Sequence, residues 1–270
     1  MTDKLAQFDG SIPETYHSHL VPFLFDAFAE DIAARVAAAA PGRVLETAAG
    51  TGVVTRFLRD SLPADATITA TDLNDAMLDV ARAALDDRAG ITYRQADAGA
   101  LPFADGGFDA VVCQFGMMFV PDKLEGYREA HRVLSPGGVL AFNVWDSLAN
   151  NPLPRITRDT MADFFDGNPP GFFNVPFGYN DVPAIEADIA TAGFSDIEVT
   201  VLSKSRESPS ARDIAYGLIH GNPSITEVRE RGTVDPATIV DTLTESIIAE
   251  AGDAPMRTAL QAIVFTARKA

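Results

Sequence analysis

Between residues 43 and 144, apolar residues follow two alternating patterns: short continuous runs, and positions three to four residues apart. Short runs bounded by turn residues are typical of buried strands, whereas the longer spacing is typical of amphipathic helices. The pattern predicts helices near 53–61, 75–85 and 123–134, and strands at 44–46, 67–71, 91–95, 110–114 and 139–144. Strands that alternate with helices in this way predict an α/β fold with right-handed crossovers and a parallel sheet covered on both faces.

The chain before and after this region follows other patterns. Apolar residues from Leu20 to Val36 lie at helical spacing, which predicts an amphipathic helix over 17–40 that ends at Pro41 and Gly42. Residues 147–180 are rich in proline and phenylalanine, which predicts an irregular segment. Beyond it the sequence predicts a helix at 181–192, a strand at 197–202, an irregular and helical block at 208–254, and a final strand at 259–267.

The most informative turn is RVLETAAGTG, residues 43–52, which joins the first predicted strand to a helix. Its small residues, Ala48, Ala49, Gly50 and Gly52, let the backbone approach a ligand closely, with a helix N-terminus facing it. This arrangement predicts a nucleotide or nucleoside site. A carboxylate from Glu46 beside the turn would repel a pyrophosphate but could orient hydroxyl and ammonium groups, which favours S-adenosylmethionine as the ligand.

Asp72 ends the second predicted strand, 20 residues beyond Gly52, where its carboxylate could accept hydrogen bonds from both ribose hydroxyls. A nicotinamide dinucleotide enzyme needs an acid at the same place, so Asp72 alone does not discriminate. The upstream turn does, because Thr55 stands where G-x-G-x-x-G requires its last glycine.

Two further strand ends supply candidates for the rest of the ligand. Asp97, or the backbone amide of Ala98, could reach the exocyclic amine and ring nitrogens of adenine. Taken alone, Asp97 fits a loop or cap acid better; together with Glu46 and Asp72 at other strand ends, it favours the adenine role. Gln114 and Phe115 end the fourth strand and would face the methyl-donor end of the site.

Four motifs in this order resemble the class I S-adenosylmethionine-dependent methyltransferases: ETAAGTG, the strand end at Asp72, ADAGALPFADGGFDAVV and EAHRVLSPGGVLAF. Over residues 8–145 the chain is most similar to the branch that includes quinone-biosynthesis C-methyltransferases. The resemblance implies a Rossmann-like, doubly wound, seven-stranded and mostly parallel sheet with an antiparallel last strand, plus helical and loop insertions covering the acceptor site. It implies S-adenosyl-L-methionine as the cofactor, bound by Tyr16, Glu46, Ala48, Gly50, Thr51, Gly52, Asp72, Leu73, Met77, Asp97, Ala98, Gln114 and Phe115.

The chain departs from the family's D-x-G-x-G-x-G turn at Glu46 and Ala48. We expect both changes to be tolerated, provided that residue 48 keeps a negative φ. We expect a single methyltransferase domain over 1–270. Its parts are an N-terminal helical cap at 1–41, a cofactor-binding core at 42–146, acceptor-site insertions at 147–180 and 208–254, and the remaining helix and strands at 181–207 and 255–270.

Charge and composition restrict the partners. The chain has 38 acidic and 21 basic residues, a formal charge of −17, which argues against a nucleic-acid partner. One cysteine and four scattered histidines give no zinc spacing, so no metal is expected. The sequence has neither a secretory pattern nor an apolar run near the ~20 residues of a membrane span, which predicts a cytoplasmic protein without stable membrane insertion. A small-molecule acceptor is the expected partner, and a homodimer stays open.

Methyl transfer from a sulfonium is an in-line displacement that depends on alignment of acceptor and methyl group rather than on a catalytic triad. Should the acceptor need deprotonation, the candidate bases are His17, His19 and His220, each of which also fits an ordinary cap, surface or packing role. The phenylalanine-rich stretch at 164–179 must be buried, either against the core or over a ligand, and a ligand there would be apolar or aromatic. A nicotinamide-dependent oxidoreductase and a non-catalytic S-adenosylmethionine-binding module are the alternative functions.

Overall fold

The computed structural model describes residues 6–270, so the first five residues of the predicted cap at 1–41 lie outside the described chain. Contacts divide the chain into two compact units. The unit that we call the helical unit contains the described residues up to 25, together with 146–178 and 203–261. The sheet unit contains 26–145, 179–202 and 262–270. The two segments predicted as insertions fall mainly in the helical unit.

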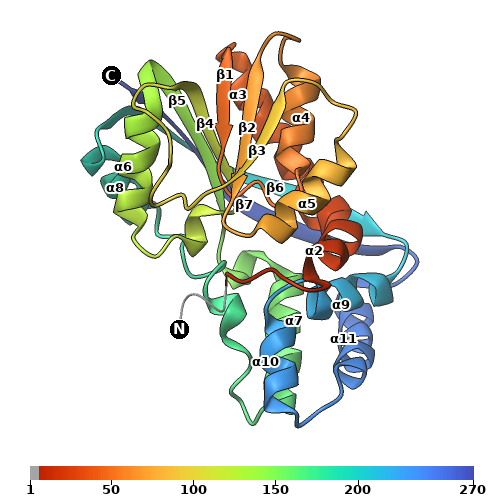
Figure 1. Ribbon diagram of the computed structural model, residues 1–270. Helices are drawn as coiled ribbons and strands as arrows, with labels where there is room; N and C mark the ends of the chain where they lie inside the picture. Colours follow the sequence, from red (N-terminus) through yellow and green to blue (C-terminus); the bar gives the residue numbers. More distant parts are fainter. Residues whose placement is uncertain (1–5) are drawn as a thin grey trace. The chain divides into compact units, whose positions relative to one another are not determined.

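The strands are β1 (Arg43–Glu46), β2 (Thr67–Asp72), β3 (Ile91–Gln95), β4 (Phe108–Gln114), β5 (Leu134–Trp145), β6 (Phe194–Ser208) and β7 (Met256–Lys269). They form one seven-stranded sheet in the order β3-β2-β1-β4-β5-β7-β6 (Figure 1). The first five strands in this order, β3, β2, β1, β4 and β5, pair in parallel, and β7 runs antiparallel to β5. The predicted α/β class, with its antiparallel last strand, is confirmed.

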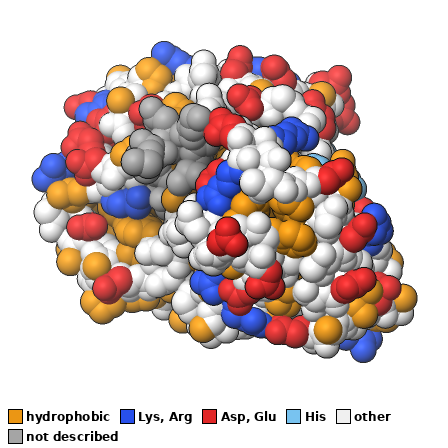
Figure 2. Space-filling model, turned by 90° about the horizontal axis from the view of Figure 1, so that it is seen from below, with side chains coloured by type: hydrophobic (Ala, Val, Ile, Leu, Met, Phe, Trp, Pro, Cys, Tyr) orange, Lys and Arg blue, Asp and Glu red, His pale blue; other side chains and the backbone are white. Residues whose placement is uncertain are grey.

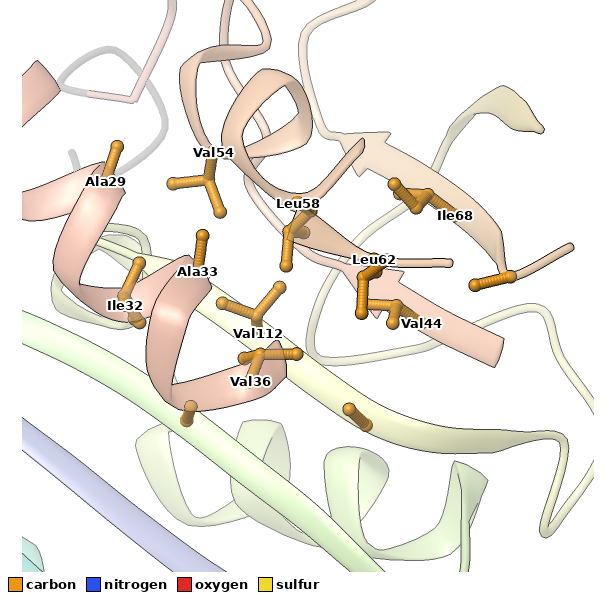
Figure 3. Close-up of a cluster of buried hydrophobic side chains, with 13 residues drawn as sticks. Ala29, Ile32, Ala33, Val36, Val44, Val54, Leu58, Leu62, Ile68 and Val112 are labelled. Carbon is orange, nitrogen blue, oxygen red and sulfur yellow. The ribbon is translucent and has the colours of Figure 1, made fainter. Parts of the chain in front are cut away.

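The helices of the sheet unit are α3 (Asp26–Ala38), α4 (Val53–Ser61), α5 (Asp75–Ala84), α6 (Lys123–Val133) and α8 (Val182–Thr191), with a short 3-10 turn, η2 (Met117–Phe119). Figure 3 shows apolar side chains of α3 and α4 meeting those of β1, β2 and β4. Ile32, Leu58, Ile68 and Val112 are all buried in this cluster. Burying each such side chain contributes about 1.5–3 kcal/mol, which is why these short runs form a rigid sheet.

Sheet topology puts the turn after β1 at a particular place. The chain runs from β1 outward to β2 and β3 on one side, and then returns to β4 on the other side of β1. Ligands of doubly wound sheets bind beyond the carboxyl ends of the strands where this reversal occurs. The segment that follows Glu46 lies at that point.

The predicted first helix, 17–40, is wrong in its start and its winding. Helical structure begins with α2 (Ile12–Thr15), continues as the π-helix η1 (Tyr16–Phe25) and ends with α3. Pro22 lies inside η1. Because proline has no N–H group, it cannot donate the bond that a regular α-helix requires at that position, and a wider winding is compatible with this loss.

The interpretation of 147–180 as irregular throughout is also wrong. After the 3-10 turn η3 (Leu148–Asn150), residues from Pro152 to Phe164 form helix α7, and a second 3-10 turn, η4 (Gly171–Asn174), follows. Pro152 and Pro154 lie in the first turn of α7, where the missing N–H groups have no intrahelical acceptor to lose. Proline therefore starts this helix rather than breaking it.

The block at 208–254 is confirmed as largely helical, with α9 (Ala211–His220), α10 (Ser224–Arg231) and α11 (Pro236–Ala251). The Ser210 hydroxyl accepts a bond from the Asp213 amide and caps α9. Helix α11 packs against α7 and α9 (Figure 1), and α9 packs against η1. Strands β6, before the block, and β7, after it, both extend several residues past their predicted ends. In β6, which is an edge strand, exposed and partly buried residues alternate. Within residues 6–270 no helix has the length and apolar character to cross a membrane.

Candidate functional site

The turn after β1 has an unusual backbone. Ala48, Gly50 and Gly52 all have positive φ, at 51°, 57° and 84°. The expectation that residue 48 keeps a negative φ is therefore wrong. A side chain in the left-handed region costs roughly 1–2 kcal/mol, so Ala48 is held there by the surrounding structure.

Hydrogen bonds fix this turn to the two strands beside β1. The Thr47 amide donates to Val112 O at 2.9 Å, and the Ala49 amide donates to Thr71 O at 2.8 Å. The Thr71 hydroxyl donates in turn to Glu46 O at 2.9 Å. The turn is thus an extension of the sheet, and its remaining amides keep fixed directions.

Glu46 lies almost completely buried at the end of β1, where its Oε2 accepts a 2.6 Å bond from the Thr55 hydroxyl of α4. Burial, with a smaller contribution from the nearby Asp72, raises the pKa of Glu46 to about 8, although the bond from Thr55 acts in the opposite direction. Without a bound cation the carboxyl is therefore largely protonated at neutral pH. Repulsion of a pyrophosphate by Glu46 is correspondingly weaker than the sequence suggested.

Asp72 ends β2 and is also buried. Its Oδ2 accepts from the Gly50 amide at 2.9 Å, and its Oδ1 accepts from the Asn74 amide at 2.8 Å. Burial raises the pKa of Asp72 while these bonds lower it, and the net direction is upward. Oδ1 also accepts a 3.4 Å bond from Asn74 Nδ2. Each carboxylate oxygen has about two lone pairs, so Oδ2 can still accept one further hydrogen bond.

Three other predicted residues lie on the same turn or on the start of α5. The Thr51 hydroxyl is buried, and within the described residues 6–270 its Oγ1 has no hydrogen-bond partner. Leu73 follows Asp72 with 51% of its surface exposed, although leucine is usually buried. Met77 is buried, and its Cε lies 3.5 Å from the point where a Cβ on Gly50 would stand. An unpaired hydroxyl, an exposed leucine and a bare glycine are features that fit a bound ligand.

The strand ends of β3 and β4 carry the remaining sheet-unit candidates. Asp97 is exposed, and its Oδ1 accepts a 2.8 Å bond from the Gly99 amide, as expected for a loop acid. Ala98, beside it, is half-buried. Gln114 ends β4 and accepts a 3.4 Å bond from the Asn143 amide group.

Phe115 is buried and has a φ of 52°. Its ring stacks on Trp145 with centroids 3.9 Å apart and meets the edge of Phe28 at 5.6 Å. The Phe115 amide donates to Asn143 Oδ1 at 3.0 Å. Asn143 is fully buried on β5, and the sequence analysis missed it because a single polar residue in an apolar run has no motif.

The turns after β1 and β4 touch each other. A Cβ on Gly116 would overlap the Cβ of Ala48 and would lie 2.6 Å from Cys113 Sγ. The methyl group of Ala48 therefore occupies space that only a glycine at 116 leaves open. Cys113 is buried, and burial raises the pKa of its thiol to about 11, so it is a packing residue rather than a nucleophile.

The other predicted residues belong to the helical unit. Tyr16 packs between Phe25, with ring centroids 4.9 Å apart, and Phe8, at 5.9 Å. His17 follows it in η1 and is half-buried. The role of Tyr16 at the cofactor stays a prediction.

Two of the three candidate bases come together around one tyrosine. His19 Nδ1 lies 2.8 Å from Asp213 Oδ1, and its ring centroid lies 5.1 Å from that of Tyr216. His220 stacks on the same tyrosine, with ring centroids 4.4 Å apart. Burial and the nearby Arg229 and His19 lower the pKa of His220. No group of residues within 6–270 has the arrangement of a metal site.

Comparison with known proteins agrees with this geometry. The family described as "Methyltransferase domain" matches residues 45–142. The ubiquinone/menaquinone biosynthesis C-methyltransferase of Stenotrophomonas maltophilia (strain K279a) is 43% identical over 110 residues, which cover 38% of this chain and 44% of that protein. The protein of the same description from Shewanella frigidimarina (strain NCIMB 400) is 34% identical over 185 residues, which cover 61% of this chain and 71% of that protein. The chain thus spans less than half the length of the first relative and about seven tenths of the second.

The fold also matches solved structures. Phosphoethanolamine N-methyltransferase 2 of Haemonchus contortus, in complex with phosphomonomethylethanolamine and S-adenosylhomocysteine, is similar with a TM-score of 0.60. The sequences are 18% identical, and the similarity covers 95% of this chain and 56% of that one. At this identity the likeness concerns the fold alone.

Proposed function

Because this chain belongs to the class I S-adenosylmethionine-dependent methyltransferases, in the branch of the UbiE-like C-methyltransferases, we propose that it methylates a small apolar or aromatic acceptor. The observation that carries the methyl-transfer proposal is the turn after β1. It combines three positive φ angles, an unpaired buried hydroxyl and two buried carboxyls at neighbouring strand ends. Because the two relatives are described as ubiquinone/menaquinone biosynthesis C-methyltransferases, an aromatic ring carbon is the first acceptor position to test.

In this proposal the sheet unit binds the cofactor through its own polar groups. Asp72 accepts a hydrogen bond from the ribose hydroxyls with the Oδ2 lone pair that Gly50 leaves unused. Thr51 supplies a hydroxyl from the turn, and the exposed Leu73 covers a face of the adenine. When bound, S-adenosylmethionine supplies a methyl group on a positively charged sulfur with a thioether as leaving group.

The proposed acceptor class rests on a ring cluster in the helical unit. Phe8 contacts Tyr16 and Phe172, with ring centroids 5.9 Å and 6.4 Å apart. Phe172 contacts Phe173 at 5.4 Å, and Phe173 contacts Phe177 at 6.5 Å. The phenylalanine-rich segment therefore packs on the N-terminal segment of the same unit rather than being spread over the surface. Phe172 and Phe173 are buried in this cluster, whereas Phe8, Tyr16 and Phe177 are half-buried. The half-buried rings favour an apolar, planar acceptor.

For an acceptor whose hydroxyl must lose a proton, we propose His19 as the base. Its Nδ1 lies 2.8 Å from a carboxylate oxygen of Asp213, which can only accept a hydrogen bond. Nδ1 therefore carries the proton of the neutral ring, and Nε2 keeps a lone pair. A positioned base of this kind contributes roughly 10²- to 10⁴-fold to the rate. The rest of the acceleration comes from alignment of acceptor and methyl group and from exclusion of water.

The direct test supplies the purified protein with S-adenosylmethionine that carries an isotopically labelled methyl group. Metabolite extracts and hydroxylated aromatic or quinol compounds serve as acceptors, and mass spectrometry detects labelled products. We expect a labelled ring-methylated product with the wild type and strongly reduced product with Asp72→Ala at limiting cofactor.

Two outcomes would overturn methyl transfer, and a third would overturn the proposed acceptor class. Stabilisation by S-adenosylhomocysteine without any labelled product in any extract would indicate a binding module without catalysis. A rise in melting temperature with NADH but not with S-adenosylhomocysteine would indicate a nicotinamide enzyme. Labelled product on an anionic aliphatic acceptor alone would overturn the acceptor class while leaving methyl transfer intact.

A further inference from the structure

The two edges of the sheet differ in length and in how their polar side chains are used. At one edge β3 is five residues long. Its Arg94 lies over the Phe103 ring, and its Gln95 donates to Leu73 O. At the other edge β6 is 15 residues long, and within residues 6–270 no strand pairs with its outer side. A long, unpaired edge strand is a template for another chain unless the protein protects it.

The charges of β6 are arranged symmetrically about its centre. Glu198 lies three residues before Val201, and Lys204 lies three residues after it. Neither Glu198 nor Lys204 forms an ion pair or a side-chain hydrogen bond within residues 6–270. Val201 has 58% of its surface exposed, although valine is usually buried. The strand centre thus combines one exposed apolar residue with two unsatisfied charges of opposite sign.

We propose that two copies of this chain pair antiparallel through the outer edges of their β6 strands, about a two-fold axis at Val201. In such a pairing residue i lies opposite residue 402 − i of the second copy, so Glu198 of each copy faces Lys204 of the other. Residues directly opposite in an antiparallel pair lie on the same face of the sheet and interact. The two Val201 side chains meet at the axis, and an isologous interface of this kind closes as a dimer.

The side-chain contacts of β6 are compatible with this pairing. Thr200 accepts a 3.4 Å bond from Arg35, and Arg206 donates to Pro22 O and Phe23 O. Ser203 and Glu207 instead bond to Gln261 and Arg257 of β7. All five bonds are made by side-chain atoms of β6. They leave the outer backbone N–H and C=O groups of β6 without a strand partner in the described chain.

A second copy fits this edge better than an unrelated chain. Lysine on an edge strand ordinarily discourages pairing, but here an acid stands at the symmetric position. The protein carries a formal charge of −17, so two copies repel each other over most of their surfaces. On the face that Figure 2 shows, acidic and basic side chains are interspersed rather than gathered by sign. Association therefore needs a segment that complements itself, and β6 does so because Glu198 lies before its centre and Lys204 lies after it.

Cysteine cross-linking tests the register directly. Val201→Cys puts two thiols at the axis, where directly opposite Cα atoms lie about 4.5–5.5 Å apart, within disulfide range. Ser205→Cys is the matched control on the same strand, because the two copies of residue 205 would lie about 27 Å apart. The natural Cys113 is buried and gives little background. We expect mild oxidation to give a covalent dimer with Val201→Cys and none with Ser205→Cys.

Charge reversal tests the partner. We expect wild-type protein to sediment at twice 28.8 kDa and either Glu198→Lys or Lys204→Glu to weaken dimerisation by roughly tenfold or more. The double reversal restores opposite charges across the axis and should restore the dimer, which misfolding of a single variant could not produce. Stabilisation of each variant by S-adenosylhomocysteine reports the fold independently of assembly.

A monomeric wild type at high micromolar concentration overturns the proposal. A dimer that persists in both single reversals also overturns it, because the interface then lies elsewhere. Equal cross-linking of Val201→Cys and Ser205→Cys overturns the register. None of these results bears on methyl transfer, which the labelling experiment tests separately.

Discussion

The sheet unit and the helical unit build their candidate sites from different groups. In the sheet unit the site consists of backbone amides, three residues with positive φ and two buried carboxyls, all at the ends of adjacent strands. In the helical unit it consists of aromatic rings and imidazoles from segments far apart in sequence, such as His19 and Asp213, which are separated by 194 residues. The first site is determined by local sequence, and the second depends on which helices pack together.

This difference matches the two parts of the proposed reaction. A cofactor of fixed structure is bound by groups whose positions follow from strand ends, so short motifs identify it. An acceptor is recognised by side chains on a surface that packing creates, so no motif names it. The following predictions test whether the sheet-unit groups act on cofactor and stability while the helical-unit groups act on the acceptor alone.

The largest expected effect concerns Glu46. Its pKa is raised from the ordinary 4.5 to about 8, so the folded protein binds a proton that the unfolded chain releases between these values. We expect this group to lower the free energy of unfolding as the pH rises from about 4.5 to about 8, by at most about 1.4 kcal/mol per pH unit. Urea denaturation at a series of pH values should show a flatter dependence for Glu46→Gln. Glu125→Gln, on the exposed start of α6, is the control, and a Glu46→Gln slope equal to that of the wild type would contradict the burial argument.

The next effect is on cofactor affinity. We expect Asp72→Ala to weaken S-adenosylhomocysteine binding by about 1.5–3 kcal/mol, or roughly 10- to 150-fold, because a charge-assisted bond to the ribose is lost. Isothermal titration calorimetry measures this. Asp75→Ala removes an exposed carboxylate that, within residues 6–270, is bonded only to Arg82, and this change should leave the affinity unchanged. Unchanged affinity in Asp72→Ala would show that Asp72 does not bind the ribose hydroxyls.

The contact between the turns after β1 and β4 comes third. We expect Gly116→Ala to lower the free energy of unfolding by about 1–3 kcal/mol, because the new methyl group overlaps Ala48 and Cys113. Adding Ala48→Gly should recover part of the loss. Gly171→Ala in the helical unit, where a Cβ meets no atom within 4 Å, is the control. Equal stability of the two alanine variants would show that the turns are not in close contact.

A smaller gain is expected from Ala48→Gly alone. Glycine adopts the φ of 51° without steric cost, so the free energy of unfolding should rise by about 1 kcal/mol. Denaturant titration checks this value. The neighbouring Ala49→Gly, where φ is not positive, should be destabilising, and a loss in both variants would contradict the strain at residue 48.

The smallest expected effect separates the two units. We expect His17→Ala, His19→Ala and His220→Ala to leave S-adenosylhomocysteine affinity nearly unchanged, since these residues belong to the helical unit. With His19 as the base, His19→Ala lowers kcat for an acceptor that must lose a proton, and Asp213→Asn lowers it too because the carboxylate that holds Nδ1 is lost. A large loss of cofactor affinity in any of the three variants would mean that this histidine acts on the cofactor, contrary to the assignment of cofactor binding to the sheet unit.

The accuracy of the sequence analysis also differs between the units. The five parallel strands were predicted within a few residues, because buried strands are short apolar runs between turn residues. Helix α7 was missed because the proline content of 147–180 was taken to indicate an irregular segment, although proline is favoured in a first helical turn, where Pro152 and Pro154 lie. The length of β6 was underestimated because its polar residues face solvent, and only its neighbour in the sheet keeps them extended.

By itself the sequence determined the sheet unit and its ligand: strand ends at Glu46 and Asp72, a small-residue turn and the order of four motifs define an S-adenosylmethionine fold. Tertiary structure decided what depends on distant neighbours. The folded structure determines that Ala48 has a positive φ and contacts Gly116, and that burial raises the pKa of Glu46. It also brings His19 to Asp213 and packs the phenylalanine-rich segment on Phe8. The physical reason is that periodicity and turn chemistry act over a few residues, whereas burial, pKa and ring contacts depend on groups that only folding brings together.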